Sequence, residues 1–213
     1  MTVNSIEALV RDEINRGTKY DSRITSKLKQ AVKWIERAYT FKHMEKYAEV
    51  VIDPTKDNPR TISIPPGFKR MEFMRVIVSE SDIRPIFVAN PQDIDQRKTD
   101  EYPTGYWQDG MDYFWFDNTP ENSVTVEMGW IGYSVVPSDK SKTLWILDNM
   151  EDIVVAQTML LLSPILKLST KQKNEYKEQR NDGMETAAIA DRELRETNTD
   201  WGMHYDGERF GST

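Results

Sequence analysis

The sequence has no cysteine and only two histidines, which removes several kinds of chemistry. Without thiols, the 213-residue chain can form no disulfide and no thiolate metal site. His43 and His204 lie far apart in the sequence and in unlike surroundings, so they predict neither a metal cluster nor a nucleophile–base pair. Residues 1–15 carry early acidic residues and no apolar signal region, which argues against secretion. We therefore expect the protein to mature in a reducing cytoplasm.

An excess of positive charge and the common catalytic motifs are missing as well. The formal net charge is −7, so the chain has no electrostatic footprint for wrapping nucleic acid. It contains no P-loop, no dinucleotide-binding fingerprint and no G-x-S-x-G motif. Paired carboxylates at 12–13 and 151–152 have the spacing of helix-surface groups, and a hydrolytic carboxylate pair would need a cleft. We predict no catalytic residue, no cofactor and no bound metal, and hence a protein that is not an enzyme.

The most apolar stretch of the chain covers residues 153–168. Its apolar residues fall on every side of a helical wheel, which is typical of a buried helix. A membrane span needs about 20 apolar residues, and this run is shorter and contains Gln157 and Pro164. We predict no membrane span, and instead a central helix in a soluble protein that is kinked or ended near Pro164.

The first part of the chain has helical periodicity. Asn4 followed by Glu7 resembles a capping box at the start of a first helix, which Gly17 ends. A longer helix is predicted from Asp21 to about Glu45, because apolar residues recur there at spacings of three and four. These apolar residues are Ile24, Leu28, Ala31, Ile35, Ala38 and Tyr39.

Between residues 47 and 133 the apolar period changes from helical to strand-like. The pair Asp109-Gly110 predicts a hairpin with a two-residue loop, and Asn90-Pro91 predicts a short helix through about Lys98. Residues 86–90 are expected to pair with residues 71–79, and residues 118–122 to form a turn. The expected strands are residues 47–53, 61–64, 71–79, 86–90, 105–108, 111–117 and 123–130. The pattern indicates an antiparallel sheet inserted between helices.

The end of the chain combines a polar helix with an aromatic segment. Residues 170–197 alternate in charge like an exposed helix, in which Gly183 predicts a break. Residues 198–213 have no period but contain large side chains, whereas disordered tails are usually poor in aromatics. We therefore predict that residues 198–213 form an extended docking tail. Its anchors are Trp201, His204, Tyr205 and Phe210.

Aromatic residues also gather in the predicted sheet. They are Tyr102, Tyr106, Trp107, Tyr113, Phe114, Trp115, Phe116 and Trp130. Core packing explains them, because alternating aromatics stabilise cross-strand pairs. The alternative is a platform for another protein or for a sugar ring. Residues 113 and 115 share one face and residues 114 and 116 the other, so one face must be covered.

These observations predict an α+β fold. Residues 1–46 and 144–197 are expected to form a helical bundle around the central apolar helix. Residues 47–143 are expected to form a β-rich insertion, and residues 198–213 the docking tail.

Several loose motifs follow one another over about residues 4 to 197. They are Trp34-Ile35, Met44-Glu45, Pro65-Pro66-Gly67-Phe68, the aromatic run 113–116, Asn118-Thr119-Pro120, the strand 124–128 that reaches Tyr133, and Trp145-Ile146-Leu147. In this order they resemble the head–tail adaptor (connector) proteins of tailed bacteriophages, particularly the short-tailed kind.

The resemblance implies a structural virion protein, assembled in the host cytoplasm as a ring of about twelve copies beneath the portal. Such a ring extends the DNA channel, through which genomic DNA passes without sequence-specific binding. Its partners would be the portal protein, the tail tube or nozzle proteins, and copies of itself. The docking tail is then expected to bind the portal or a neighbouring subunit, and the turn at Thr119, Pro120 and Glu121 to face the tail.

Two other functions fit the same residues. A carbohydrate-binding or glycan-active module would use the aromatic β region and surface carboxylates. A tail or baseplate component elsewhere in the particle would share the structural role without the position at the portal.

Overall fold

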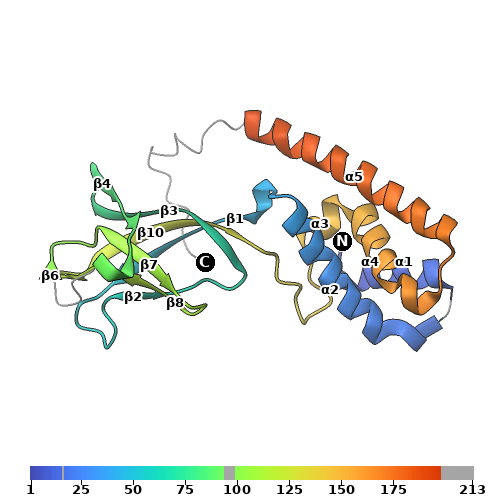
Figure 1. Cartoon of the computed structure of the whole chain (residues 1–213), viewed down its shortest axis with the longest axis horizontal. Helices are drawn as coiled ribbons and strands as arrows, with labels where there is room; N and C mark the ends of the chain where they lie inside the picture. The colour runs from blue at the N-terminus through green and yellow to red at the C-terminus, as the bar shows by residue number, and fades with distance from the viewer. Residues whose placement is uncertain (16, 94–98, 198–213) are drawn as a thin grey trace. The chain divides into compact units, whose positions relative to one another are not determined.

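The computed structural model describes residues 1–15, 17–93 and 99–197, and within it the chain divides into two compact units. The helical unit comprises Met1–His43 together with the chain from Val136 onward. The β unit comprises Met44–Val135. Helices and sheets are thus segregated along the chain (Figure 1), which confirms the α+β class.

Tertiary context sets the ends of the helices in the helical unit. Thr2, and not Asn4, caps the first helix, because its side chain accepts a hydrogen bond from the backbone N–H of Ser5 at 3.1 Å. The second helix ends at Ala38 and not near Glu45, where the chain turns and starts its first strand. The elements are α1 (Val3–Ile14), η1 (Gly17–Tyr20), α2 (Asp21–Ala38), η2 (Lys42–Met44), α3 (Trp145–Asn149), α4 (Glu151–Leu166) and α5 (Thr170–Thr197).

Helix α4 is the apolar helix expected from the sequence, and α1, α2, α3 and α5 all contact it. Even its polar residues Gln157 and Thr158 are buried. Pro164 lies in the last turn, and the helix ends at Leu166, after which Lys167 adopts the left-handed conformation with φ 54°. Among the described residues, no helix is long and apolar enough to cross a membrane.

Helix α5 runs unbroken from Thr170 to Thr197, so the predicted break at Gly183 is wrong. Gly183 instead permits close packing, since a Cβ there would lie 2.6 Å from Cγ1 of Ile153 on α4. Arg180 on the same helix stacks over the ring of Trp34 on α2 at 4.6 Å. It also donates a hydrogen bond to Gln157 Oε1 on α4 at 3.1 Å. Helix α5 is therefore fastened to both helices at its middle.

The segment before α3 is held against α1 by a buried polar cluster. Lys140 Nζ lies 2.7 Å from Glu7 Oε2 and 2.8 Å from the hydroxyl of Thr25. That hydroxyl donates to the other oxygen of Glu7 at 2.6 Å. Because Glu7 is buried, its charge needs these partners. The cluster joins α1, α2 and the returning chain.

The β unit consists of two four-stranded sheets and one small ladder. The first sheet has the order β1-β10-β3-β4 and the second β2-β8-β7-β5, while β6 pairs with β9. The bounds are β1 (Glu45–Ile52), β2 (Thr61–Ser63), β3 (Phe68–Ser79), β4 (Asp82–Pro85), β5 (Phe87–Val88), β6 (Thr99–Asp100), β7 (Gly105–Asp109), β8 (Tyr113–Phe116), β9 (Thr119–Pro120) and β10 (Val124–Gly132). Most pairs are antiparallel as predicted, but β5–β7 and β6–β9 are parallel.

Strand pairing departs from the sequence prediction in two places. Strand β3 pairs with β4, whereas residues 87–88, expected to pair with β3, form β5 and pair with β7. In the hairpin, Asp109 pairs with Tyr113, so the loop has one residue more than predicted. Gly110 opens this loop with φ +63°, a conformation that favours glycine.

A short helix after Asn90 is only partly present. The 3-10 turn η3 covers Pro91–Asp93, while residues 94–98, which complete the predicted helix, lie outside the described residues.

Both sheets contribute to a single core. Val126 and Met128 of β10 and Met74 of β3 come from the first sheet, and Phe114 and Phe116 of β8 come from the second. Aromatic packing of the core is thus confirmed for the inward residues of the aromatic strands, and the outward residues remain for other roles.

Candidate functional site

The aromatic strands β7 and β8 divide their side chains between the core and the surface. Phe114 and Phe116 are buried, whereas Tyr113 is 46% exposed and Trp115 is half-buried on the opposite face. This alternation is the one predicted from the sequence, in which one face had to be covered. The two faces of the second sheet therefore offer two different surfaces.

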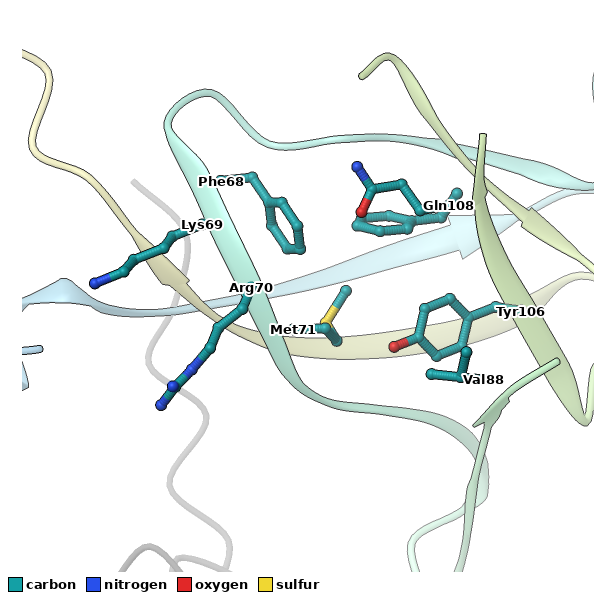
Figure 2. Close-up of a pocket in the computed structure, with 8 residues that line it drawn as sticks. Phe68, Lys69, Arg70, Met71, Val88, Tyr106 and Gln108 are labelled. Carbon is teal, nitrogen blue, oxygen red and sulfur yellow. The ribbon is translucent and has the colours of Figure 1, made fainter. Parts of the chain in front are cut away.

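On the inner side of the second sheet, residues of β3, β5, β7 and β8 line an aromatic groove of about 340 Å³. Its rings pack edge to face: Phe114 lies 5.2 Å from Phe68 and 5.8 Å from Tyr106 between centroids. Such pairs add about 0.5–1.5 kcal/mol beyond their buried area, so the floor of the groove is preformed. Met71 and Val88 complete its apolar wall, as Figure 2 shows.

The charged groups beside the aromatic groove lie at its margin. Lys69 and Arg70 extend away from the rings (Figure 2), so their stems line the groove and their charges lie outside it. Gln108 lies across the groove from them and donates to the Gly110 carbonyl at 2.9 Å. Burial raises the pKa of the Tyr106 hydroxyl, which therefore stays neutral. The groove suits an apolar or aromatic guest with acidic flanks.

The outer face of the second sheet carries a second aromatic surface. Trp107 and Trp115 are cross-strand partners whose rings stack at 6.0 Å and 23°. Phe87, which pairs with Gly105 next to Trp107, is 67% exposed. Met111 at the tip of the hairpin is 88% exposed. Exposed apolar groups are therefore present at both ends of β7, beside Gly105 and at the hairpin tip.

The predicted tail-facing turn forms a short strand. Thr119 and Pro120 make up β9 and pair with Thr99 and Asp100 of β6. Pro120 is buried, while Glu121 is exposed and donates its backbone N–H to the Asp100 carbonyl at 3.0 Å. Of Thr119, Pro120 and Glu121, Glu121 is the exposed one.

The predicted docking residues of the C-terminal segment cannot be placed. Trp201, His204, Tyr205 and Phe210 lie outside the described residues. Their proposed role therefore rests on the sequence alone.

In the helical unit, the other histidine belongs to a stacked aromatic cluster. The ring of His43 stacks on Trp145 at 4.1 Å and on Phe41 at 5.8 Å. Its Nε2 lies 3.1 Å from Glu36 Oε1, and Glu36 is buried. The His43–Glu36 pair thus satisfies a buried carboxylate and joins the end of α2 to α3.

A buried ion pair lies on the outer face of the first sheet. The guanidinium of Arg75 on β3 pairs with the carboxylate of Glu127 on β10, directly across the ladder. Burial raises the pKa of Glu127, and the positive charge of Arg75 opposes that shift. Arg75 also packs over the ring of Phe73 at 4.9 Å. The pair is structural, because it is satisfied within the sheet.

Neither unit offers a metal centre within the described residues, where no group of histidine and carboxylate side chains could hold an ion. A small hollow in the helical unit contains the pair Tyr176–Glu13, in which the hydroxyl donates to the carboxylate at 2.7 Å. Burial raises the pKa of the Tyr176 hydroxyl, and this hydrogen bond raises it further by a smaller amount. The Tyr176–Glu13 pair thus links α5 to α1 within the helical unit.

The sequence prediction missed the groove and the exposed edge strand. The sequence singles out Phe68 only as part of the motif Pro65-Pro66-Gly67-Phe68 and predicts Val88 in a strand beside β3. No local signal distinguishes an apolar residue that lines a groove from one in the core, because both occur in alternating strands.

Comparison with known proteins identifies the family. The family model described as "SU10 adaptor protein" matches residues 1–201. No curated protein matches the chain. Among solved structures, a chain of the "Neck of empty GTA particle computed with C6 symmetry" is similar, with 15% sequence identity and a TM-score of 0.27. That match covers 76% of this chain and 77% of the other. The chain belongs to the SU10 adaptor protein family, which confirms the resemblance to head–tail adaptor proteins of tailed bacteriophages.

Proposed function

We propose that this protein forms a ring of about twelve copies between the portal and the tail of a bacteriophage particle. The ring extends the DNA channel, and genomic DNA passes through it without sequence-specific binding. The portal protein binds on one side, and tail tube or nozzle proteins dock on the other. The observation that carries the proposal is the family match over residues 1–201. The chain enters the virion after synthesis in the host cytoplasm.

The charge of the chain suits a channel. With a net charge of −7, its surface repels phosphates more than it binds them, so DNA can slide past. The family is one of structural virion proteins, which points to a role without catalysis.

We infer a division of labour between the two units. In the helical unit α1, α2, α3 and α5 all contact α4, and we assign this unit to attachment at the portal. The β unit, with its exposed Phe87, Met111 and Tyr113, serves the tail side. Interfaces concentrate their energy in aromatic and methionine side chains, which supports this assignment.

Glu121 tests the assignment of sides better than a deletion of the predicted turn. Removing residues 119–121 would leave β6 without its partner strand β9 and would remove the buried Pro120 from its packing site. Glu121→Lys instead reverses one exposed charge and leaves the ladder intact. The variant is expected to enter heads normally and to bind tails less well. Loss of the adaptor from the head would show that this side faces the portal.

The C-terminal segment is proposed as the anchor that retains the protein in the particle. A chain ending at Thr197 should keep the melting transition of the full chain, because the segment lies beyond α5. Its incorporation into heads should collapse, because aromatic anchors are commonly worth about 2 kcal/mol or more each. Normal incorporation of the shortened chain would show that the segment is no anchor.

The decisive experiment for the function is imaging of particles with and without this protein. Particles assembled without it are expected to carry a portal but no tail, and added purified protein should restore tail attachment. A ring of density should then appear between portal and tail. Normal tails on particles that lack the protein would refute the proposal.

Glycan binding remains a second candidate, favoured by the outward pair Trp107 and Trp115. Flat indole faces are suitable platforms for sugar rings. Quenching of tryptophan fluorescence by host surface polysaccharide would support this role, and Trp107→Ala should abolish the quenching. Unchanged tryptophan fluorescence of the unaltered chain with the polysaccharide, or quenching that persists in Trp107→Ala, would exclude it.

A further inference from the structure

We propose that the aromatic groove of one copy receives the C-terminal segment, residues 198–213, of a neighbouring copy. The inference rests on the proposed ring, because it names the contact that joins one subunit to the next. It assigns a function to a surface that the packing of the β unit leaves open.

The groove has the properties of a socket for aromatic side chains. Its floor consists of the edge-to-face rings of Phe68, Tyr106 and Phe114, and its volume of about 340 Å³ lies at the lower end of the range for ligand pockets. Val88 stands at its margin and is 77% exposed. An apolar residue this exposed, beside preformed aromatic walls, is expected to be covered in the assembled state.

The charges of groove and segment are complementary. Lys69 and Arg70 carry positive charge just outside one wall of the groove, where Arg70 pairs with Glu72 at 2.6 Å and Lys69 lies over the ring of Tyr133 at 5.5 Å. The segment carries three acidic residues against one basic residue, and its aromatic residues are spaced among them. The acidic residues are Asp200, Asp206 and Glu208, and the basic residue is Arg209. Aromatic rings can therefore enter the groove while carboxylates remain at its basic margin.

Length and symmetry favour a neighbouring copy as the source of the segment. Residues 198–213 in extended form reach about 50 Å beyond the end of α5. Every copy carries both the socket and the segment, and the two are different surfaces. A contact of this head-to-tail kind propagates from copy to copy and closes into a ring when the rotation allows it. The contact is thus of the type that a ring requires.

The absence of native cysteine allows a direct test by cross-linking in the full-length chain. One preparation carries Val88→Cys at the groove and a second carries Gly207→Cys in the segment. A matched control preparation carries Met111→Cys, which is at least as exposed (88% against 77%) but lies at the hairpin tip and outside the groove. Each variant replaces an exposed or terminal residue, so folding is unaffected. Equal amounts are mixed at about 100 μM and treated with a short bismaleimide, conditions that suit a weak contact.

The mixture of Val88→Cys with Gly207→Cys should give several-fold more covalent heterodimer than the Met111→Cys control. An excess of synthetic peptide 198–213 should suppress this product. The same peptide with Trp201, Tyr205 and Phe210 replaced by alanine should not suppress it. Equal yields at the two positions, no heterodimer at all, or no effect of the aromatic peptide would each overturn the proposal.

A further experiment distinguishes a segment bound to a neighbouring copy from a segment bound to the groove of its own chain. A single chain carrying both cysteines is treated at high dilution, where only intramolecular closure can occur. Efficient closure there, with none between the two single variants, would show that the segment occupies the groove of its own chain, and the proposal would be wrong. All of these measurements use purified protein, so their failure would leave the position of the adaptor in the particle untouched. Conversely, a particle with normal tails in the absence of the protein would refute the function without affecting the cross-link.

Discussion

The contact between Gly183 and Ile153 gives a prediction whose sign is opposite to that of helix propensity. In an ordinary helix interior, Gly→Ala stabilises by about 1 kcal/mol. Here the new methyl group would lie 2.6 Å from Cγ1 and 3.1 Å from Cδ1 of Ile153. Ile153 is buried and β-branched, so its χ1 has essentially one rotamer in a helix and cannot swing away. Overpacking of this kind costs about 1–3 kcal/mol.

Gly183→Ala is therefore expected to destabilise the helical unit by about 1 kcal/mol net, equivalent to a fall in Tm of about 2–4 °C. Far-ultraviolet circular dichroism follows this unit, because the long helices lie within it. In an Ile153→Ala background, which itself costs about 2–5 kcal/mol, the colliding atoms are gone. There Gly183→Ala should stabilise by about 1 kcal/mol.

The control is Ala190→Gly at an exposed position of the same helix. It should cost about 1 kcal/mol in both backgrounds, since it changes propensity alone. If Gly183→Ala stabilises the chain with Ile153 intact, the close approach of α4 and α5 does not exist and the reasoning fails.

Four other outcomes are expected. Lys140→Met should destabilise by about 2–3 kcal/mol in urea unfolding, because it strands the buried carboxylate of Glu7, and adding Glu7→Gln should recover most of the loss. Arg75→Met should destabilise the β unit similarly. In Arg75→Met, burial raises the folded-state pKa of Glu127 above the ordinary glutamate pKa, so the folded state binds more protons than the unfolded state between these two values. The stability of this variant should therefore fall as the pH rises through that window, which a pH series of melting curves measures. Gly110→Val should lower the free energy of unfolding by about 1–3 kcal/mol through backbone strain at φ +63°, with no atom within 4 Å of the new Cβ, and thermal melting measures it. Light scattering on the purified chain should show monomers or weak association, and a stable large ring at micromolar concentration would contradict this expectation.

Local pattern was sufficient where an element depends on its own residues. Helix α5 has the bounds Thr170–Thr197 that its charge alternation predicts, and α4 is as apolar as its composition indicates. The inward and outward alternation of Tyr113 to Phe116 also followed from the two-residue period of a strand. Each of these features repeats over several residues within one segment, so no knowledge of a partner is needed.

The family resemblance also came from the sequence, since the order of loose motifs is a property of the chain itself. The sequence patterns alone fit several functions, and the family match over residues 1–201 supports a structural role between head and tail. The aromatic cluster left core packing and a binding platform open, and the structure places Phe114 and Phe116 in the core and Trp107 and Trp115 on the outer face.

Only the tertiary structure decided which strands pair and which apolar residues stay exposed. Phe87 and Val88 have the composition of a core strand, yet they form a sheet edge because β4 occupies the place beside β3. Gly183 predicts a helix break from sequence, whereas the structure shows that it permits the close approach of Ile153. The groove of Phe68, Tyr106 and Phe114 joins residues up to 46 positions apart in sequence. Such features depend on contacts between distant segments, and a distant contact leaves no periodic trace in either segment alone.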